Sequence, residues 1–364
     1  MESKVELKTD LKTEDFNFDL PGELIAQYPC EKRGEDKLFV LDRKTCGFSH
    51  RLVGELPQII ESGSLLVFNN SKVRKARLYA HDAATGSETE FLLLKPLGNN
   101  SWQAIMKKSK KYKNGGLFIF PSGIEGHLSF DRGGLPVLRF CSGSGDIDDA
   151  YFDSYGHVPL PPYIKRGDEH SSMFDDGERY QNVYAEKTGS VAAATAGLHF
   201  TKEMLAALEI RGIETAFITL HIGMGTFLPV HAENLKDHVM HEEQYSIDAG
   251  AADKIEKAKQ EGRKIIAVGT TTMRTLESAI KNGKLARGEG STSIFIYGDY
   301  KFKAADALFT NFHTPKSTLL MLVSSFAGAY SNAEDGRKMI MHAYSAAMEN
   351  GYRFFSYGDA MLII

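Results

Sequence analysis

Residues 264–280 read KIIAVGTTTMRTLESAI, and this stretch decides the fold class. The apolar run from Lys264 to Val268 is typical of a buried strand, and helical spacing follows from Thr271 to Ile280. A strand that passes directly into a helix is the repeating unit of a mostly parallel sheet covered by helices on both faces. In such sheets ligands collect at the carboxyl ends of the strands.

The neighbouring segments repeat this alternation of strand and helix. Capping residues and glycine stops mark the ends of the helices, so the boundaries can be read from the sequence. The pattern predicts, in order, a helix over 201–212, a strand over 213–220, a helix over 248–262, helices over about 317–329 and 333–350, and a last strand near Phe354.

Between residues 71 and 160 the pattern changes to short alternating segments separated by Gly, Asn, Ser and Asp. Regularly spaced short strands with turn residues between them predict a small β-barrel. Leu65 to Phe68 reads as a buried strand of the larger sheet, so the barrel interrupts the α/β domain. We expect a polar extension over 1–12, a discontinuous α/β sandwich as catalytic domain over 13–70 and 160–364, and an inserted β-barrel domain over 71–159. The barrel strands are expected over 90–95, 102–106, 117–120, 126–130 and 135–140.

The composition of the 364 residues, with 42% apolar and 25% charged side chains, is that of a folded globular protein. The three cysteines form no Cys-x-x-Cys pair, which favours a reducing, cytoplasmic setting. No segment approaches the roughly 20 apolar residues that span a bilayer, and no signal peptide is visible, so we expect no membrane contact. A monomer is the working expectation for the oligomeric state.

The formal net charge of -4 removes the global argument for nucleic-acid binding, although local basic runs remain. The alternative interpretation of such runs is a solvated surface. Two runs lie in the first half of the chain: Lys72, Arg74, Lys75 and Arg77, and then Lys107, Lys108, Lys110, Lys111 and Lys113.

Several junctions between strands and helices could bind a ligand. Residues 268–274, VGTTTMR, combine free backbone N–H groups, three hydroxyls and a helix dipole, which suits a phosphate or a carboxylate. Residues 221–227 and the small-residue run 189–199 allow a ligand to approach the backbone closely. In 311–317, His313 and Lys316 bracket a helix start that could hold a carboxylate. For each junction, ordinary capping or packing is the alternative.

A metal site built on His238, His241 and Glu242, with His231 nearby, is a further alternative. The spacing does not match the known His-Glu-His zinc motifs, so a histidine pair on a helix surface is favoured and no metal is expected.

A set of ordered segments along the chain carries a family pattern. The segments are FDLP at 18–21, IAQYP at 25–29, VPLPPYI at 158–164, YQ at 180–181 with VYA at 183–185, TAGLHFT at 195–201, His221 with GTF at 225–227 and PV at 229–230, VGTT at 268–271, RTLES at 274–278, NFH at 311–313, PKSTLLM at 315–321 and FSYGDAM at 355–361. On these segments the chain from Phe16 onward resembles the S-adenosylmethionine:tRNA ribosyltransferase-isomerase family of queuosine biosynthesis.

The chain departs from the family pattern at four places. The family usually has proline at 194, arginine at 72, Ile-Pro at 74–75 and Pro-Gly at 298–299, where this chain has Ala194, Lys72, Arg74-Lys75 and Gly298-Asp299. These departures affect local loop geometry and substrate affinity more than the class of reaction.

The resemblance implies an α/β domain interrupted by a β-barrel. It also implies that the ribosyl part of S-adenosylmethionine is transferred and isomerised onto 7-aminomethyl-7-deazaguanine at the tRNA wobble position, which gives epoxyqueuosine and releases adenine and methionine. S-adenosylmethionine is then a consumed co-substrate, and no metal or redox cofactor is implied.

This reaction needs a positioned base, an acid for adenine, a clamp for the methionine zwitterion and a dry site. We assign proton transfer to His199 and His221, because histidine carries protons near neutral pH and both lie in matched segments. The expected S-adenosylmethionine contacts are Thr270, Thr271 and Arg274 for the carboxylate or ribose, Glu277 for the ammonium, His313 and Lys316 for the carboxylate or a tRNA phosphate, and Tyr184 and Asp359 for adenine or ribose.

The two basic runs are expected to contact tRNA phosphates, which position the nucleic acid without reading its bases. Two rival hypotheses remain at this point. One is the metal-dependent hydrolase, and the other is a catalytically inactive tRNA-binding homologue, suggested by the departures from the family pattern.

Overall fold

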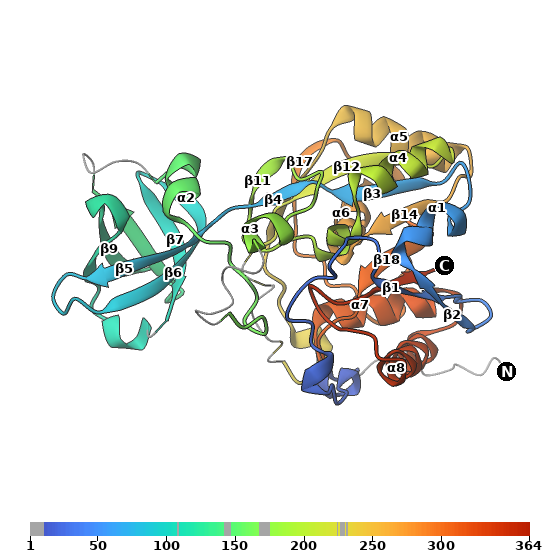
Figure 1. The fold of residues 1–364 in the computed structure, drawn as a ribbon, viewed down its shortest axis with the longest axis horizontal. Coiled ribbons are helices and arrows are strands. Elements are labelled where there is room, and N and C mark those ends of the chain that lie inside the picture. The colour runs from blue at the N-terminus through green and yellow to red at the C-terminus, as the bar shows by residue number, and fades with distance from the viewer. Residues whose placement is uncertain are drawn as a thin grey trace.

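The computed structural model describes residues 11–107, 109–141, 147–166, 175–223, 225, 230 and 232–364. A large α/β body carries a small barrel at one end, and strand β4 (Ser71–Val73) runs between the two (Figure 1). Of the polar extension expected over 1–12, residues 1–10 lie outside the described part. Leu11 and Lys12 already contact the body, since Lys12 forms a β-bridge with Asn234.

Within the described residues, nine strands form one sheet in the order β17-β13-β12-β3-β14-β18-β19-β1-β2. The strands are β1 (Lys37–Leu41), β2 (Phe48–Leu52), β3 (Leu65–Asn69), β12 (Glu214–Leu220), β13 (Glu243–Ile247), β14 (Ile265–Val268), β17 (Gly288–Thr292), β18 (Ala307–Asn311) and β19 (Ala360–Ile363).

The prediction of a mostly parallel sheet is confirmed for the four central strands, β12, β3, β14 and β18, which all run parallel. The flanks are largely antiparallel, so the whole sheet is mixed. Parallel neighbours need a crossover connection, usually a helix. Between β12 and β13 no α-helix occurs among the described residues, and the chain turns back antiparallel. The last strand is β19, a few residues beyond the predicted position at Phe354.

Helices cover both faces of the sheet, as predicted, because each buried strand alternates its side chains between two cores. Leu65 and Val67 of β3 pack into one cluster, while Leu66 and Phe68 pack into the other. The first cluster includes residues of α5 (Ala249–Gln260), α6 (Thr270–Ala279), α7 (Thr318–Ala327) and α8 (Ala333–Glu349), and the second includes residues of α1 (Leu56–Ile59) and α4 (Lys202–Ile210).

The caps expected for two of these helices are present. Thr201 Oγ1 accepts a hydrogen bond from Met204 N at 3.1 Å, and Asp248 Oδ1 accepts one from Ala251 N at 2.7 Å. These bonds satisfy N–H groups that the first helical turn leaves open.

The inserted barrel is closed, with strand order β10-β7-β6-β5-β8-β9. Each of the five predicted segments overlaps a strand, with Phe120 and Leu135 just outside, and the sixth strand, β5, was not predicted. Phe91, Phe118, Phe120 and Phe140 fill the interior, and α2 (Asp149–Tyr155) packs its Phe152 into the same cluster. The strands are β5 (Arg77–Asp82), β6 (Glu88–Gly98), β7 (Ser101–Met106), β8 (Gly116–Ile119), β9 (Glu125–Phe130) and β10 (Pro136–Phe140).

The barrel is joined to the sheet through β4, which follows β3 after one residue and pairs in parallel with β11 (Lys187–Ser190). This short ladder lies beside the carboxyl ends of the central strands. None of the helices in the described part of the chain combines the length and apolar character needed to cross a membrane.

Candidate active site

A cavity of about 310 Å³ opens at the carboxyl ends of β14 and β18, where the parallel sheet was expected to bind its ligand. Its wall combines the small-residue segment Ala192–Ala196, the start of α6 at Gly269–Thr271 with Arg274, and the residues Thr310–Thr314 that end and follow β18. All four sequence junctions therefore contribute to one cavity, and the junction around 221–227 contributes Ile222.

The start of α6 faces this cavity without a side-chain cap. Its N-cap is Gly269, whose φ of 92° lies in the left-handed region that favours glycine. Thr270 and Thr271 follow and line the cavity, and Asn69 Nδ2 at the end of β3 donates to Thr271 Oγ1 at 3.3 Å. Uncapped N–H groups and the helix dipole make this end of α6 attractive to negative or hydrogen-bond-accepting groups.

Arg274 supplies the positive charge of the cavity. Its Nη1 lies 2.6 Å from Glu243 Oε2, and Glu243 Oε1 accepts a hydrogen bond from Gly223 N at 3.2 Å. Arg274 is only 5% exposed, and its Nε and Nη2 are buried with no hydrogen-bond partner among the described residues. A buried donor without an acceptor costs free energy, more so when it is charged. These two nitrogens can donate to an anionic group that enters the cavity.

His313 also lines the cavity, as part of the segment after β18. Its Nε2 lies 2.9 Å from Thr310 Oγ1, and its backbone N donates to the Tyr344 hydroxyl. Burial lowers the pKa of His313 to about 3, so the imidazole is neutral at physiological pH. It can exchange hydrogen bonds with a ligand, but it carries no charge for a carboxylate or a phosphate.

His199, which we expected to transfer protons, does not line this cavity. The side chain is 3% exposed, its Nδ1 lies 2.9 Å from Asp36 Oδ2, and its Nε2 lies 3.1 Å from Asn311 Nδ2. Both ring nitrogens are thus engaged inside the protein. The residue that faces the cavity in its place is Asn311.

His221 lies at the end of β12, beneath the β4–β11 ladder. Its Nδ1 is 2.8 Å from Ser71 Oγ, which is 2.6 Å from Ser190 Oγ. Burial, and then the positive charge of Arg74, lower the pKa of His221 below its ordinary 6.5. No described residue hydrogen-bonds its Nε2. The ring is only partly buried, but His221 itself is not among the described residues that line the cavity, whereas its neighbour Ile222 is.

The structure places four other predicted contacts away from the cavity. Glu277 accepts hydrogen bonds from the backbone N of Lys303 and Ala304 and from the Tyr300 hydroxyl, so its carboxylate is fully used. Asp359 accepts from the backbone N of Lys37 and Arg353. The remaining two are Tyr184, packed against Phe68 and Phe217 in the second core, and Lys316, ion-paired with Glu14 at 2.6 Å.

The first basic run is mostly built into ion pairs. Arg74 pairs with Asp149 at 2.8 Å and Lys75 with Asp153 at 3.8 Å, which fastens the exit from β4 to α2. Lys72 is exposed beside Thr188 in the β4–β11 ladder. Arg77 and Lys107 share Glu90, at 3.2 Å and 2.5 Å.

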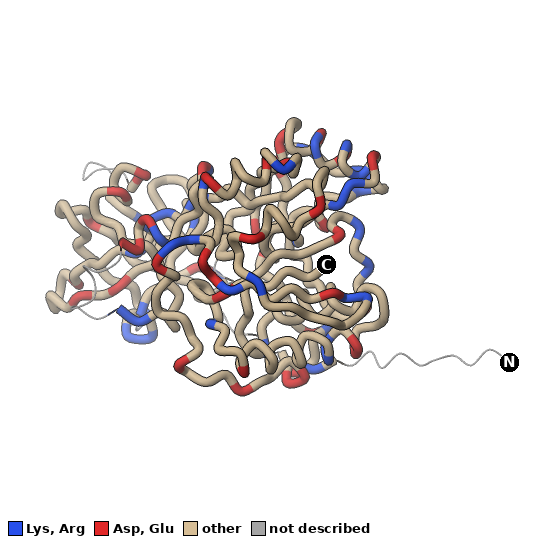
Figure 2. Tube along the Cα trace, turned by 45° about the vertical axis from the view of Figure 1, so that its right-hand side comes forward, with Lys and Arg blue, Asp and Glu red and all other residues tan. Residues whose placement is uncertain are grey.

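The second basic run lies on the barrel, where it forms a blue stretch at the lower edge in Figure 2. Lys110, Lys111 and Lys113 are exposed there, and none has an ion pair among the described residues. Lys108 lies outside the described part of the chain. These three lysines are therefore more available to an external anion than the paired residues of the first run.

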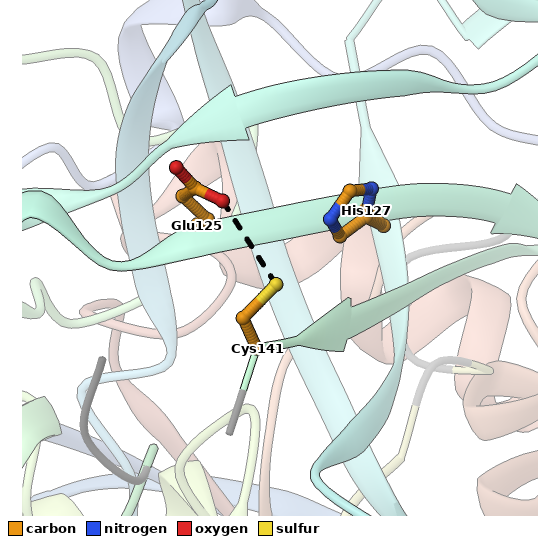
Figure 3. A group of neighbouring side chains, drawn as sticks. All are labelled: Glu125, His127 and Cys141. Carbon is orange, nitrogen blue, oxygen red and sulfur yellow. Dashed lines mark hydrogen bonds between the residues drawn. The ribbon is translucent and has the colours of Figure 1, made fainter. Parts of the chain in front are cut away.

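The structure does not support a metal centre on the predicted histidines. His238, His241 and Glu242 form no cluster of potential ligands among the described residues, and His231 lies outside them. A different group, Glu125, His127 and Cys141, does bring three donor atoms within 4.8 Å of one another (Figure 3). It lies on β9 and just after β10 of the barrel, not in the cavity.

The departures from the family pattern fall at different places. Ala194 lines the cavity, and its carbonyl accepts a hydrogen bond from Asn182 Nδ2 at 3.2 Å. Asp299 Oδ1 accepts from Ala333 N at 2.6 Å and so caps the entry to α8, while Gly298 takes a φ of 67°. The loop at Ala194 and the loop at Gly298-Asp299 are thus each held by a local hydrogen bond, and the second also uses the positive φ that glycine allows.

The polar cavity residues that were not predicted as site residues from the sequence include Glu243, Asn311 and Thr195. Asn311 and Thr195 lie inside the motifs NFH and TAGLHFT. The sequence therefore marked these segments as part of a site, but it gave no role to these two side chains. Glu243 begins β13, within a run of His and Glu that the sequence alone read as a surface. Its pairing with Arg274 depends on the antiparallel β13, which the strand and helix alternation did not indicate.

Comparison with known proteins places these features in a family. The family model described as "Queuosine biosynthesis protein" matches residues 13–363. A protein of Treponema denticola named S-adenosylmethionine:tRNA ribosyltransferase-isomerase is 51% identical, over 97% of this chain and 99% of that protein. A protein of the same name from Borreliella afzelii is 45% identical, over 97% and 99%.

A solved structure is also similar. The crystal structure of S-adenosylmethionine tRNA ribosyltransferase from Thermotoga maritima aligns with a TM-score of 0.54 and 34% sequence identity, covering 96% of this chain and 100% of that one. This agrees with an α/β domain that carries an inserted barrel. With a family model that covers nearly its whole length and relatives of matching length, the chain belongs to the queuosine biosynthesis protein family.

Proposed function

We propose that this protein transfers and isomerises the ribosyl moiety of S-adenosylmethionine onto 7-aminomethyl-7-deazaguanine at the tRNA wobble position. The products are epoxyqueuosine in the tRNA, adenine and methionine. The family membership supports the reaction, and one structural observation supports the place where it occurs. That observation is Arg274, buried in the cavity with two guanidinium nitrogens that lack an acceptor.

The pair of Arg274 and Glu243 complements the methionine end of the donor. The α-carboxylate binds Nε and Nη2 of Arg274, since a planar guanidinium suits bidentate recognition of a carboxylate. The α-ammonium lies toward Glu243, whose carboxylate is already oriented by Gly223 N. Glu243 thus takes the role that the sequence suggested for Glu277.

The ribosyl part lies between this pair and the start of α6. Thr270 and Thr271 offer hydroxyls and helix N–H groups, and Ala192–Ala196 provide a wall of small side chains that lets the sugar approach the backbone. The walls are largely apolar, and exclusion of water strengthens every charged contact inside the site.

Proton transfer is assigned to the edge of the cavity near His221. The sulfonium acidifies the C5′ proton, so a base of modest strength can remove it, and a neutral imidazole is such a base. The lowered pKa of His221 keeps the ring unprotonated near neutral pH. Adenine then leaves, the aminomethyl nitrogen adds, and closure of the carbocycle and the epoxide expels methionine.

The tRNA approaches from the side of the barrel. Lys72 and the exposed lysines Lys110, Lys111 and Lys113 contact phosphates, while the wobble nucleotide enters the cavity past the β4–β11 ladder. We propose that the protein acts in the cytoplasm as a monomer without a metal or redox cofactor. A tRNA substrate and three cysteines without a Cys-x-x-Cys pair support this location.

Single-turnover release of adenine tests this function. Purified protein is mixed with S-adenosylmethionine labelled in the adenine ring and an anticodon stem-loop that carries 7-aminomethyl-7-deazaguanine. We expect adenine and modified RNA in equal amounts, and none with a stem-loop that carries guanine. Binding of the stem-loop without adenine release would instead identify the inactive tRNA-binding homologue.

A further inference from the structure

A chain of buried hydrogen bonds links Asp36 to the wall of the cavity. Asp36 Oδ2 meets His199 Nδ1 at 2.9 Å, His199 Nε2 meets Asn311 Nδ2 at 3.1 Å, and Thr195 Oγ1 donates to Asn311 Oδ1 at 2.9 Å. Asp36, His199 and Asn311 are 6%, 3% and 2% exposed, and only Asn311 and Thr195 reach the cavity.

The direction of every bond in this chain follows from the carboxylate at its inner end. An ionised carboxylate only accepts hydrogen bonds and the NH₂ group of Asn311 only donates, so the His199 proton lies on Nδ1 and Nε2 accepts. Asn311 then turns its NH₂ toward His199 and its carbonyl oxygen toward Thr195. The Thr195 hydroxyl donates its proton in a hydrogen bond to that carbonyl oxygen.

At the cavity surface this chain holds the Thr195 hydroxyl in one hydrogen-bonding orientation. Thr195 Oγ1 has no other hydrogen-bond partner among the described residues, and its proton is directed at Asn311 Oδ1. Thr195 Oγ1 therefore presents only its lone pairs to a ligand. A threonine with a free rotor could donate or accept, whereas this one only accepts.

We propose that Asp36, His199 and Asn311 act as positioning residues that make Thr195 a dedicated acceptor for a ribose hydroxyl of the bound nucleoside. This inference rests on the proposed function, because it takes its ligand from that reaction. It changes the role of His199 from proton carrier to positioning residue.

The surroundings of Asp36 support an ionised inner end. Burial raises the pKa of Asp36, but its interactions with His199 and Arg353 outweigh burial, and the net shift is downward. Arg353 Nη2 lies 3.1 Å from Asp36 Oδ1, which leaves Oδ2 to His199.

The decisive experiment reverses the chain without changing its shape. In Asp36→Asn the new amide donates to Nδ1, the His199 proton moves to Nε2, Asn311 turns over, and Thr195 becomes a donor. We expect kcat for adenine release to fall on the order of tenfold or more, with a smaller change in KM for the stem-loop. In the Thr195→Val background the Asp36→Asn change should add less than about twofold, because there is no hydroxyl left to reorient.

Full additivity of the two losses, or a folded Asp36→Asn enzyme with unchanged kcat, would overturn the inference. Arg353→Lys is the matched control, since lysine keeps the positive charge that favours an ionised Asp36, loses the guanidinium geometry and leaves the bond to His199. It should lower Tm and retain kcat; a loss as large as that of Asp36→Asn would assign the effect to the ion pair and refute the chain.

A second measurement does not depend on the stability of Asp36→Asn. Thr195 lies at the cavity surface, so Thr195→Val and Thr195→Ser should both fold. Serine should retain activity and valine should lose it. With 2′-deoxy or 3′-deoxy S-adenosylmethionine as donor, the valine penalty should vanish for one of the two analogues.

A valine penalty that persists with both analogues contradicts a ribose ligand for Thr195. Absence of adenine release from the unmodified enzyme would instead refute the proposed function itself. The two failures are thus distinguishable.

Discussion

Glu243 Oε2 lies 2.6 Å from Arg274 Nη1, and both side chains are more than nine-tenths buried in the wall of one cavity. The pair joins β13, an antiparallel flank of the sheet, to the first turns of α6. Because only one edge of the guanidinium is paired, the pair both balances the buried charge and leaves donors for a ligand.

Arg274→Lys tests the donor site. Lysine keeps the charge but loses the fork, so we expect KM for S-adenosylmethionine to rise by about tenfold or more, equivalent to about 1.4 kcal/mol. KM for the stem-loop should change little. Arg263→Lys is the matched control, since Arg263 is ion-paired to Glu214 and Glu261 outside this cavity, and it should keep both constants. Equal KM values for S-adenosylmethionine in the two variants would remove Arg274 from the donor site.

Gly189→Ala tests the placement of His221. A Cβ at position 189 would lie 2.5 Å from His221 Nδ1, closer than real Cβ contacts allow, so the ring must leave Ser71. We expect a loss of adenine release of at least tenfold in a protein that remains folded by circular dichroism. Gly22→Ala, where a Cβ would meet no atom within 4 Å, is the control. Full activity of Gly189→Ala would show that the reaction does not depend on the position of this imidazole.

The pH profile gives an independent test of the same group. A base with a lowered pKa is unprotonated above that pKa, so single-turnover rates should rise with pH through a value below 6.5 and then level. Since the charge of Arg74 helps to lower this pKa, Arg74→Gln should shift the acid limb to higher pH. The neighbouring Lys75→Gln serves as control and should leave it in place. An acid limb that does not move in Arg74→Gln would assign it to another group.

Much of the fold, but less of the site, could be predicted from sequence. Strands such as Leu65–Asn69 and caps such as Thr201 follow from local pattern, which tertiary contacts then reinforce. Glu277 shows the limit. Helical spacing puts it near Arg274, yet three donors at 300–304 hold its carboxylate. Glu243 lies far from Arg274 in the sequence and comes close to it because β13 pairs within the sheet. The spacing of residues along the chain does not predict this pairing.

Metal removal should leave the reaction unchanged. Among the described residues that line the cavity, Glu243 and His313 are the only side chains of the usual metal-binding types, and Glu243 is committed to Arg274. We expect the same rate of adenine release after treatment with a chelator and desalting. His127→Ala, which disrupts the Glu125, His127 and Cys141 group on the barrel, should also retain the rate. Loss of activity on chelation, restored by zinc, would favour the metal-dependent rival.

The barrel lysines should govern the salt dependence of RNA binding. Lys110, Lys111 and Lys113 are exposed and have no ion pair among the described residues, so each can replace counterions on a phosphate, whereas Lys75, Arg77 and Lys107 already face carboxylates. Each phosphate contact contributes about 0.7 to 0.9 to the slope of log K against log salt. Replacing the three lysines by alanine should therefore raise KM for the stem-loop and reduce that slope by roughly two, at unchanged KM for S-adenosylmethionine. The control is alanine at Lys202, Lys254 and Lys257, three exposed lysines of α4 and α5, which should leave the slope intact. If the two triple variants have the same slope, the barrel run is an ordinary solvated surface and the tRNA must approach from another side.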